Sequence, residues 1–94
     1  MEGQTLLPTK TIKVLIGDGR QQVQMSLRGI IYYVNGNHFV SRIVTANRDV
    51  WFNDGMANNA ISRYEDKLTN MSLQTLSCAP DTGGQAIAMV YTRQ

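Results

Sequence analysis

The sequence has very little cysteine or histidine, since Cys78 and His38 each occur only once in 94 residues. One cysteine excludes an intrachain disulfide, and it also excludes a zinc site built on paired cysteines. One histidine, without a cluster of carboxylates at ligand spacing, gives no support for another kind of metal site. We therefore expect no metal and no other cofactor, and a fold held together by its own core.

Long apolar runs and runs of basic residues are also absent. The first ten residues, MEGQTLLPTK, have only two adjacent leucines, which fits neither a signal peptide nor a membrane span. We expect a cytoplasmic or nuclear protein with no membrane partner. Nine Lys and Arg residues oppose seven Asp and Glu residues, and the basic ones are scattered along the chain. Because nucleic-acid binding needs a clustered basic face, this pattern argues against it.

Apolar and polar residues alternate in several segments, which is typical of β-strands with one buried face. The tripeptides NGN (35–37) and NRD (47–49) are turn signals, so the strands around them are predicted to form an antiparallel meander. Gly29 is expected to permit a bulge where the apolar pattern changes face. The predicted strands cover residues 11–16, 22–34, 38–46, 50–53 and 86–93.

The segment between the fourth and last of these strands is harder to interpret. Residues 58–65, NNAISRYE, suit a short strand with its turn, whereas 66–76 carries Leu68, Met71 and Leu76 at roughly helical spacing. We predict one short helix there. The fold class is therefore mainly β, α+β at most: a small antiparallel sheet or meander with one short helix. A chain of this length forms a single domain, 1–94, with 1–10 as a flexible tail.

Several residues invite a functional interpretation. His38 stands beside the NGN turn, and Asn53 and Asp54 follow two aromatics at the end of a strand. An imidazole and a group that orients it are two parts of a thiol-hydrolase triad. The simpler interpretation is a locally bonded histidine beside a hairpin and an NDG turn. Aromatic residues in the strands of a small domain are usually core or cross-strand pairs, and we predict a core position for four of them. These are Tyr32, Tyr33, Trp51 and Phe52.

Three stretches, LRGIIYYVNGNHFVSRIV (27–44), VWFNDGM (50–56) and AIAMVYTR (86–93), resemble in this order the last third of the ubiquitin-specific protease catalytic domain. In that family a strand leads into a Gly-His-Tyr turn, and an aromatic segment ending in Asp-Asp or Asn-Asp precedes a final strand. The resemblance implies that His38 is the general base, that Asn53 orients it, and that Asp54 supports the oxyanion region. The pair Trp51 and Phe52 would pack below them.

The departures from the family pattern concern the nucleophile. The family's cysteine box lies upstream of the histidine, on a helical subdomain, and no cysteine precedes His38 in this chain. Asn37 and Phe39 stand where the family has glycine and tyrosine, and the zinc-binding fingers are missing. The resemblance therefore implies a pseudoenzyme: a non-catalytic protein-interaction module that forms a homodimer or binds a protein partner, with ubiquitin or a ubiquitin-like protein as the family's candidate.

Two other functions stay open. A deubiquitinase-like thiol hydrolase could have its site completed in trans, or by Cys78 as a displaced nucleophile, although Cys78 lies in a loop after the histidine. The third possibility is a nucleic-acid-binding accessory domain. Its basic surface would have to be assembled from Arg20, Arg28, Arg42 and Arg48.

Overall fold

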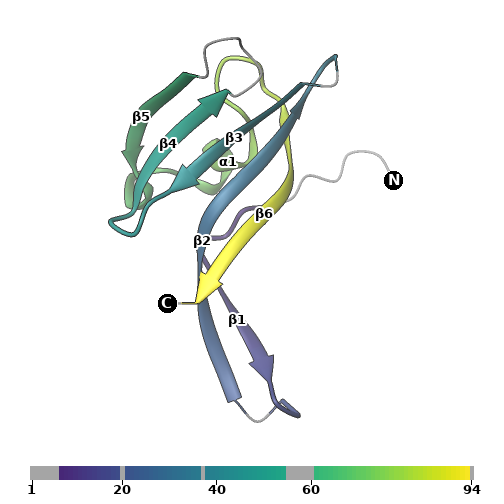
Figure 1. The fold of residues 1–94 in the computed structure, drawn as a ribbon, viewed down its shortest axis with the longest axis vertical. Helices are drawn as coiled ribbons and strands as arrows, with labels where there is room; N and C mark the ends of the chain where they lie inside the picture. Colours follow the sequence, from purple (N-terminus) through teal and green to yellow (C-terminus); the bar gives the residue numbers. More distant parts are fainter. Residues whose placement is uncertain (1–6, 20, 37, 55–60, 94) are drawn as a thin grey trace.

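The computed structural model describes residues 7–19, 21–36, 38–54 and 61–93 of the chain. In this part six strands form one antiparallel sheet, accompanied by a single short α-helix (Figure 1). The predicted mainly β class is confirmed. The elements are β1 (Thr11–Ile16), β2 (Gln21–Val34), β3 (His38–Val44), β4 (Asp49–Asp54), β5 (Ile61–Lys67), the 3-10 turn η1 (Leu68–Asn70), α1 (Leu73–Ser77) and β6 (Gln85–Arg93).

The long strand β2 organises the sheet. The strand order is β1-β2-β3-β4-β5, and β6 also pairs with β2. Residues 25–26 of β2 pair with both β1 and β6, and residues 29–33 pair with both β3 and β6. Hence β1 and β3 share one edge of β2, while β6 occupies the other. The register with β6 shifts between Leu27 and Gly29, so the bulge predicted near Gly29 is confirmed, as is the meander of β2, β3 and β4.

The first half of β2 and all of β1 project from the body as a two-stranded arm (Figure 1). Its alternate residues Ile12, Val14, Val23 and Met25 share one face and are half-buried. Strand β6 reaches along β2 only as far as Met25, so the outer part of the arm is paired on one edge alone. Two-stranded ribbons of this kind are marginally stable by themselves.

Of the expected tail, 1–10, residues 1–6 lie outside the described part of the chain. Pro8 is fully buried. The Tyr91 hydroxyl donates to the Thr9 carbonyl at 2.8 Å, and the Leu27 amide donates to the Lys10 carbonyl at 2.9 Å. The described end of this segment therefore packs against β2 and β6.

One face of the sheet, here called the inner face, carries the core and is covered by the segment 68–79, with α1 behind the strands in Figure 1. Leu68, Met71 and Leu76 are buried, but two short turns replace one continuous helix. The chain is extended at Met71 and Ser72, and the Ser72 hydroxyl then caps α1 by accepting from the Thr75 amide at 3.0 Å. The core residues are Leu27, Ile30, Tyr32, Val40, Val44, Val50, Phe52, Leu68, Met71, Leu76, Ala79 and Ala86.

A buried arginine joins this covering segment to the sheet. Arg42 of β3 is 2% exposed, and its Nε and Nη2 donate to the two carboxylate oxygens of Glu65 at 2.6 and 3.1 Å. Its Nη1 donates to the carbonyls of Thr75 and Cys78 at 2.8 and 3.0 Å and to the Tyr32 hydroxyl at 2.9 Å. The Tyr32 hydroxyl donates in turn to the Leu76 carbonyl at 2.6 Å. Three strands are thereby tied to the end of α1.

Two pKa values report on this network. Burial acts to lower the pKa of the Arg42 guanidinium, but its hydrogen bonds with Glu65 and Tyr32 outweigh that effect and raise it. Burial raises the pKa of Tyr32 to about 12, against the opposing influence of the Arg42 charge. The guanidinium is therefore permanently charged and the phenol stays protonated.

Arg42→Met should lower the free energy of unfolding by about 3–5 kcal/mol, because it leaves the Glu65 carboxylate without its buried partner. Adding Glu65→Leu should recover part of this loss, since the double variant no longer buries an unpaired charge. Urea unfolding of the two single variants and the double variant measures the coupling. Arg63→Met is the control: its exposed pair with Asp81 should contribute about 1 kcal/mol or less. If the losses in free energy of unfolding of the two single variants simply add up in the double variant, Arg42 and Glu65 are not coupled and the proposed network is contradicted.

The shifted Tyr32 pKa predicts alkaline destabilisation. Above pH 10 the phenol of the unfolded chain loses its proton, while the folded chain retains it until the pKa of about 12 is reached. The unfolded state then binds fewer protons, so the free energy of unfolding falls as pH rises through this window, by up to about 3 kcal/mol. Urea unfolding across the window should show this fall in the wild type and a shallower one in Tyr32→Phe. Equal slopes would refute the assignment.

Candidate functional site

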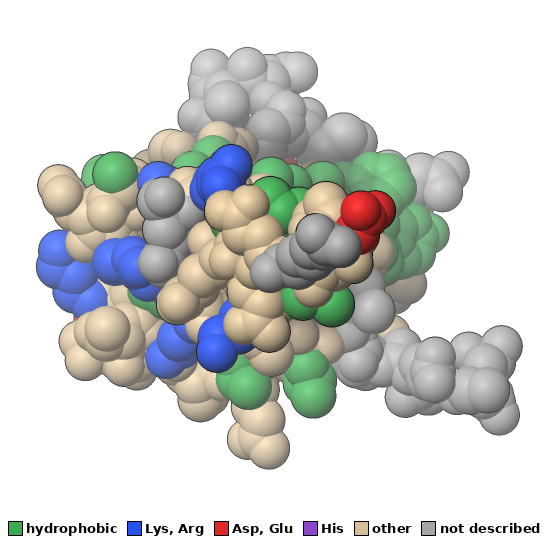
Figure 2. Space-filling model, turned by 90° about the horizontal axis from the view of Figure 1, so that it is seen from below, with side chains coloured by type: hydrophobic (Ala, Val, Ile, Leu, Met, Phe, Trp, Pro, Cys, Tyr) green, Lys and Arg blue, Asp and Glu red, His purple; other side chains and the backbone are tan. Residues whose placement is uncertain are grey.

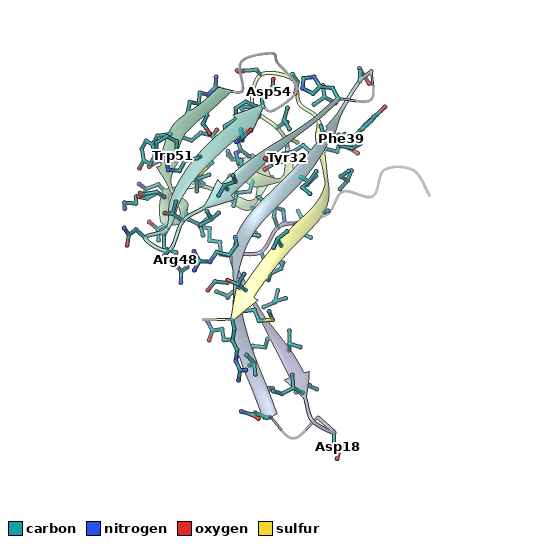
Figure 3. The ribbon with its side chains drawn as sticks, viewed as in Figure 1. Asp18, Tyr32, Phe39, Arg48, Trp51 and Asp54 are labelled. Carbon is teal, nitrogen blue, oxygen red and sulfur yellow. The ribbon has the colours of Figure 1, made fainter. Side chains whose placement is uncertain are left out.

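The residue pair that carries the family resemblance lies at one end of the sheet. His38 is the first residue of β3 and Asp54 the last of β4, and the imidazole Nε2 lies 2.8 Å from the Asp54 Oδ1. Alternate residues of a strand share a face, so His38 lies with Val40 and Asp54 lies with Phe52 on the inner side. Asp54 is at the same end of the body as the β2–β3 turn (Figure 3). Both side chains are partly exposed, at 31% and 24%.

Asn53, the residue expected to orient His38, lies on the opposite face. Its side-chain amide donates to the Ser62 hydroxyl at 3.4 Å, across the β4–β5 pairing. One step along a strand reverses the side of the sheet, so Asp54 takes the contact with the imidazole instead. The structure thus brings together His38 and Asp54 but not His38 and Asn53.

The carboxylate of Asp54 can hold the imidazole in one orientation and leave Nδ1 as the second ring nitrogen. That is the orienting half of a general-base arrangement, and it needs a nucleophile within hydrogen-bond reach of the ring. Asn37 and residues 55–60, the sequence neighbours of the pair, lie outside the described residues.

Cys78, the displaced nucleophile considered above, lies elsewhere. Its backbone forms an isolated bridge with Gln85 of β6, and its carbonyl accepts a hydrogen bond from Arg42 of β3 at 3.0 Å. The exposed thiol lies 3.8 Å from the Ser77 hydroxyl, and among the described interactions none joins it to His38. Within one chain, the imidazole and the thiol do not meet.

The outer face of the sheet carries large apolar side chains that nothing covers in the described chain. Eight of them are between 37% and 49% exposed. They are Ile31, Tyr33, Phe39, Ile43, Trp51, Tyr64, Ile87 and Val90. We call this set the outer apolar face. In Figure 3, Trp51 lies on the β4 side of the body and Phe39 near the β2–β3 turn.

The strand register aligns these side chains in rows. Val90, Gly29, Ile43, Trp51 and Tyr64 are successive partners across five strands. Trp51 and Tyr64 meet edge-on with ring centroids 5.7 Å apart, and Tyr33 and Phe39 do so at 5.4 Å. The predicted core position is therefore right for Tyr32 and Phe52, whereas Tyr33 and Trp51 are exposed and form cross-strand pairs, the other position expected of such aromatics. Segment 68–79 covers only one face, so alternate aromatics remain exposed.

The sequence does contain a signal for this outer face. The runs IIYYV and VWF are apolar at consecutive positions, which is typical of strands whose two faces are both covered. The Arg42–Glu65 pair had no comparable signal, because Glu65 reaches the inner face at a register shift in β5.

Of the four arginines considered for nucleic-acid binding, two do not contribute to a basic surface of the described chain. Arg42 is buried on Glu65 and cannot contact a phosphate backbone, which is a correction to the predicted set. Arg20 lies outside the described residues. Arg28 and Arg48 remain, on the β2 bulge and in the β3–β4 turn.

Within residues 7–19, 21–36, 38–54 and 61–93, no group of three or more His, Cys, Asp and Glu side chains is placed to hold a metal ion. No helix in the described part is long and apolar enough to span a bilayer. Comparisons with protein-family models, with curated proteins and with solved structures found no match. The resemblance to ubiquitin-specific proteases therefore stays a prediction from the sequence motifs.

Cys78 should react with iodoacetamide at neutral pH no faster than free cysteine does, because no imidazole is close enough to take its proton. The rate should be unchanged in His38→Ala and in Asp54→Ala. Mass spectrometry of samples quenched over time measures it, with Ser77→Ala as a control for the neighbouring hydroxyl. Fast alkylation that depends on His38 would overturn this geometry.

Proposed function

We propose that this protein is a non-catalytic protein-interaction module that self-associates through the outer apolar face. The observation that carries the proposal is the exposure of eight large apolar side chains on one side of one sheet. Contiguous apolar surface of this extent is rare on a monomeric soluble domain and marks an interaction site. The separation of Cys78 from His38 supports the non-catalytic part of the proposal.

The area of the face suits a stable interface. From their exposed fractions, and about 200 Å² for a fully exposed large side chain, the eight residues together expose roughly 700 Å². Each partner in a standard-sized interface contributes about 800 Å². Aromatic residues, which are the most frequent anchors of such interfaces, make up half of the set.

A second copy of the chain is the occupant that the face favours. Ser41, Asn53 and Ser62, which pair across β3, β4 and β5, are neutral, and the Asp49 carboxylate is neutralised by Lys67 at 2.7 Å. Such a surface does not repel its own copy, and two twisted sheets pack well face to face at about 10 Å.

A second candidate function rests on the contact between His38 and Asp54. An oriented imidazole without a thiol is what a hydrolase completed in trans would require from this chain. If the protein is such a hydrolase, Cys78 or a partner's cysteine should be alkylated fast, and this reaction should depend on His38. A ubiquitin-like partner, which the sequence resemblance suggests, fits either candidate.

Self-association should bury Trp51, the only tryptophan of the chain, and thereby shift its fluorescence emission to shorter wavelength as concentration rises. Sedimentation velocity over the same concentrations should give a monomer–dimer equilibrium. Ile43→Glu should weaken the dimer at least tenfold, because it places a charge in the middle of the apolar row.

Leu15→Glu is the matched control, since Leu15 is an equally apolar, exposed residue that lies on the arm. Circular dichroism checks that both variants stay folded. A chain that remains monomeric at all concentrations would refute self-association, and so would equal weakening by the two substitutions. If ubiquitin added to such a monomer shifts the Trp51 emission, the outer apolar face binds a ubiquitin-like partner instead.

A further inference from the structure

A hollow of about 280 Å³ lies where the arm joins the body, between the bulge of β2 and the β3–β4 turn. Figure 3 places Arg48 at this turn, on the side of the body from which the arm projects. The proposed self-association does not use this hollow. It is lined by Ser26, Leu27, Arg28, Thr45, Ala46 and Arg48.

Arg28 is held in place at one wall of the hollow. Its Nε donates to the Thr92 hydroxyl at 3.0 Å, and its Nη1 donates to the Val44 carbonyl at 3.4 Å. These bonds fix the plane of the guanidinium, and neither of them uses Nη2. A guanidinium fixed in this way loses little conformational freedom when it binds a ligand.

Arg48 is held by an unusual backbone conformation. Its φ is +67°, in the left-handed region that glycine and asparagine prefer. The turn is closed by hydrogen bonds from the Arg48 amide to the Thr45 carbonyl and from the Thr45 amide to the Asp49 carbonyl, both 2.9 Å. A strained position that holds a long charged side chain, where asparagine would fit better, suggests a role for the side chain.

The charge of the two arginines is not neutralised within the described residues. No acidic side chain lines the hollow. Asp49, the nearest carboxylate in sequence, is paired with Lys67 at 2.7 Å, and neither Arg28 nor Arg48 takes part in an ion pair of the described chain. Figure 2 looks onto this end of the molecule and shows several patches of Lys and Arg side chains, whereas Asp and Glu are seen mainly in one small area.

We propose that the hollow binds a phosphate monoester through the guanidinium groups of Arg28 and Arg48. Two guanidinium groups match a phosphate dianion in charge, and their N–H groups suit its oxygens. The Thr45 hydroxyl accepts a hydrogen bond from the Asp49 amide at 3.1 Å, so its own proton is available to a phosphate oxygen. The volume exceeds that of one phosphate group and leaves room for the first atoms of the esterified molecule.

The test measures binding of inorganic phosphate, phosphoserine and dimethyl phosphate to the full chain at constant ionic strength, by amide chemical shifts in NMR spectra. Phosphate and phosphoserine should both shift the amides of residues 26–28 and 45–48, and dimethyl phosphate, with one charge, should bind at least tenfold more weakly. Tighter binding of phosphoserine than of phosphate would support a monoester as the ligand, and equal binding would overturn the monoester in favour of phosphate itself.

Variants separate the site from general charge effects. Arg48→Asn should weaken phosphate binding at least tenfold and leave the fold intact, because asparagine suits the left-handed conformation. Arg63→Asn removes the same charge at an exposed residue outside the hollow and should leave binding unchanged. Arg28→Lys should bind with intermediate affinity. Equal loss in Arg48→Asn and Arg63→Asn, preference for dimethyl phosphate, or no shift at residues 26–28 and 45–48 would each overturn the proposal.

Discussion

The rest of the structure depends on the buried guanidinium of Arg42. The segment that covers the inner face has only one short helix, and of its last carbonyls that of Thr75 accepts a backbone hydrogen bond, from the Cys78 amide at 3.4 Å. Arg42 and Tyr32 donate to three of them, those of Thr75, Leu76 and Cys78. Buried carbonyls left unpaired would each be unfavourable, and an unpaired Glu65 carboxylate more so. The covering segment can therefore pack on the sheet favourably only when the buried charges of Arg42 and Glu65 are paired at the same time.

The covering segment reaches only one face of the sheet, and the apolar side chains of the other face are therefore left exposed. Strand residues alternate, so apolar runs such as IIYYV deliver half of their side chains to the inner core and half to the outer face. The inner half is buried by α1 and its flanking turns, and the outer half stays exposed. Among the described residues no second layer covers the outer apolar face, and the proposed second copy would supply one.

Alternation and turn signals were sufficient to predict most of the strands, because period-two patterns and Asn-Gly turns are local properties. Alternation along β3, for example, puts His38, Val40 and Arg42 on one face, and the burial pattern of the strand agrees for Val40 and Arg42. These local patterns could not assign Tyr33 and Trp51 to the exposed face, since that depends on how much sheet the distant segment 68–79 covers. His38 contacts Asp54 and not Asn53 because these two neighbouring residues of β4 point to opposite faces of the sheet. A family pattern alone does not determine which of the two faces His38. The sequence pattern could not show that Arg42 is buried, because its partner Glu65 reaches the inner face only at the register shift in β5.

The same guanidinium also bears on catalysis. A general base acts on a thiol only within hydrogen-bond reach, and the single thiol of the chain belongs to a segment that Arg42 holds by the Cys78 carbonyl. That segment is attached to β6 through the bridge to Gln85, while His38 lies at the start of β3. Two carbonyls of that segment, those of Thr75 and Cys78, accept hydrogen bonds from Arg42 at 2.8 and 3.0 Å. Among the described interactions the thiol has no hydrogen bond to the imidazole, so a hydrolase built on His38 would need either movement of this segment or a nucleophile from another chain.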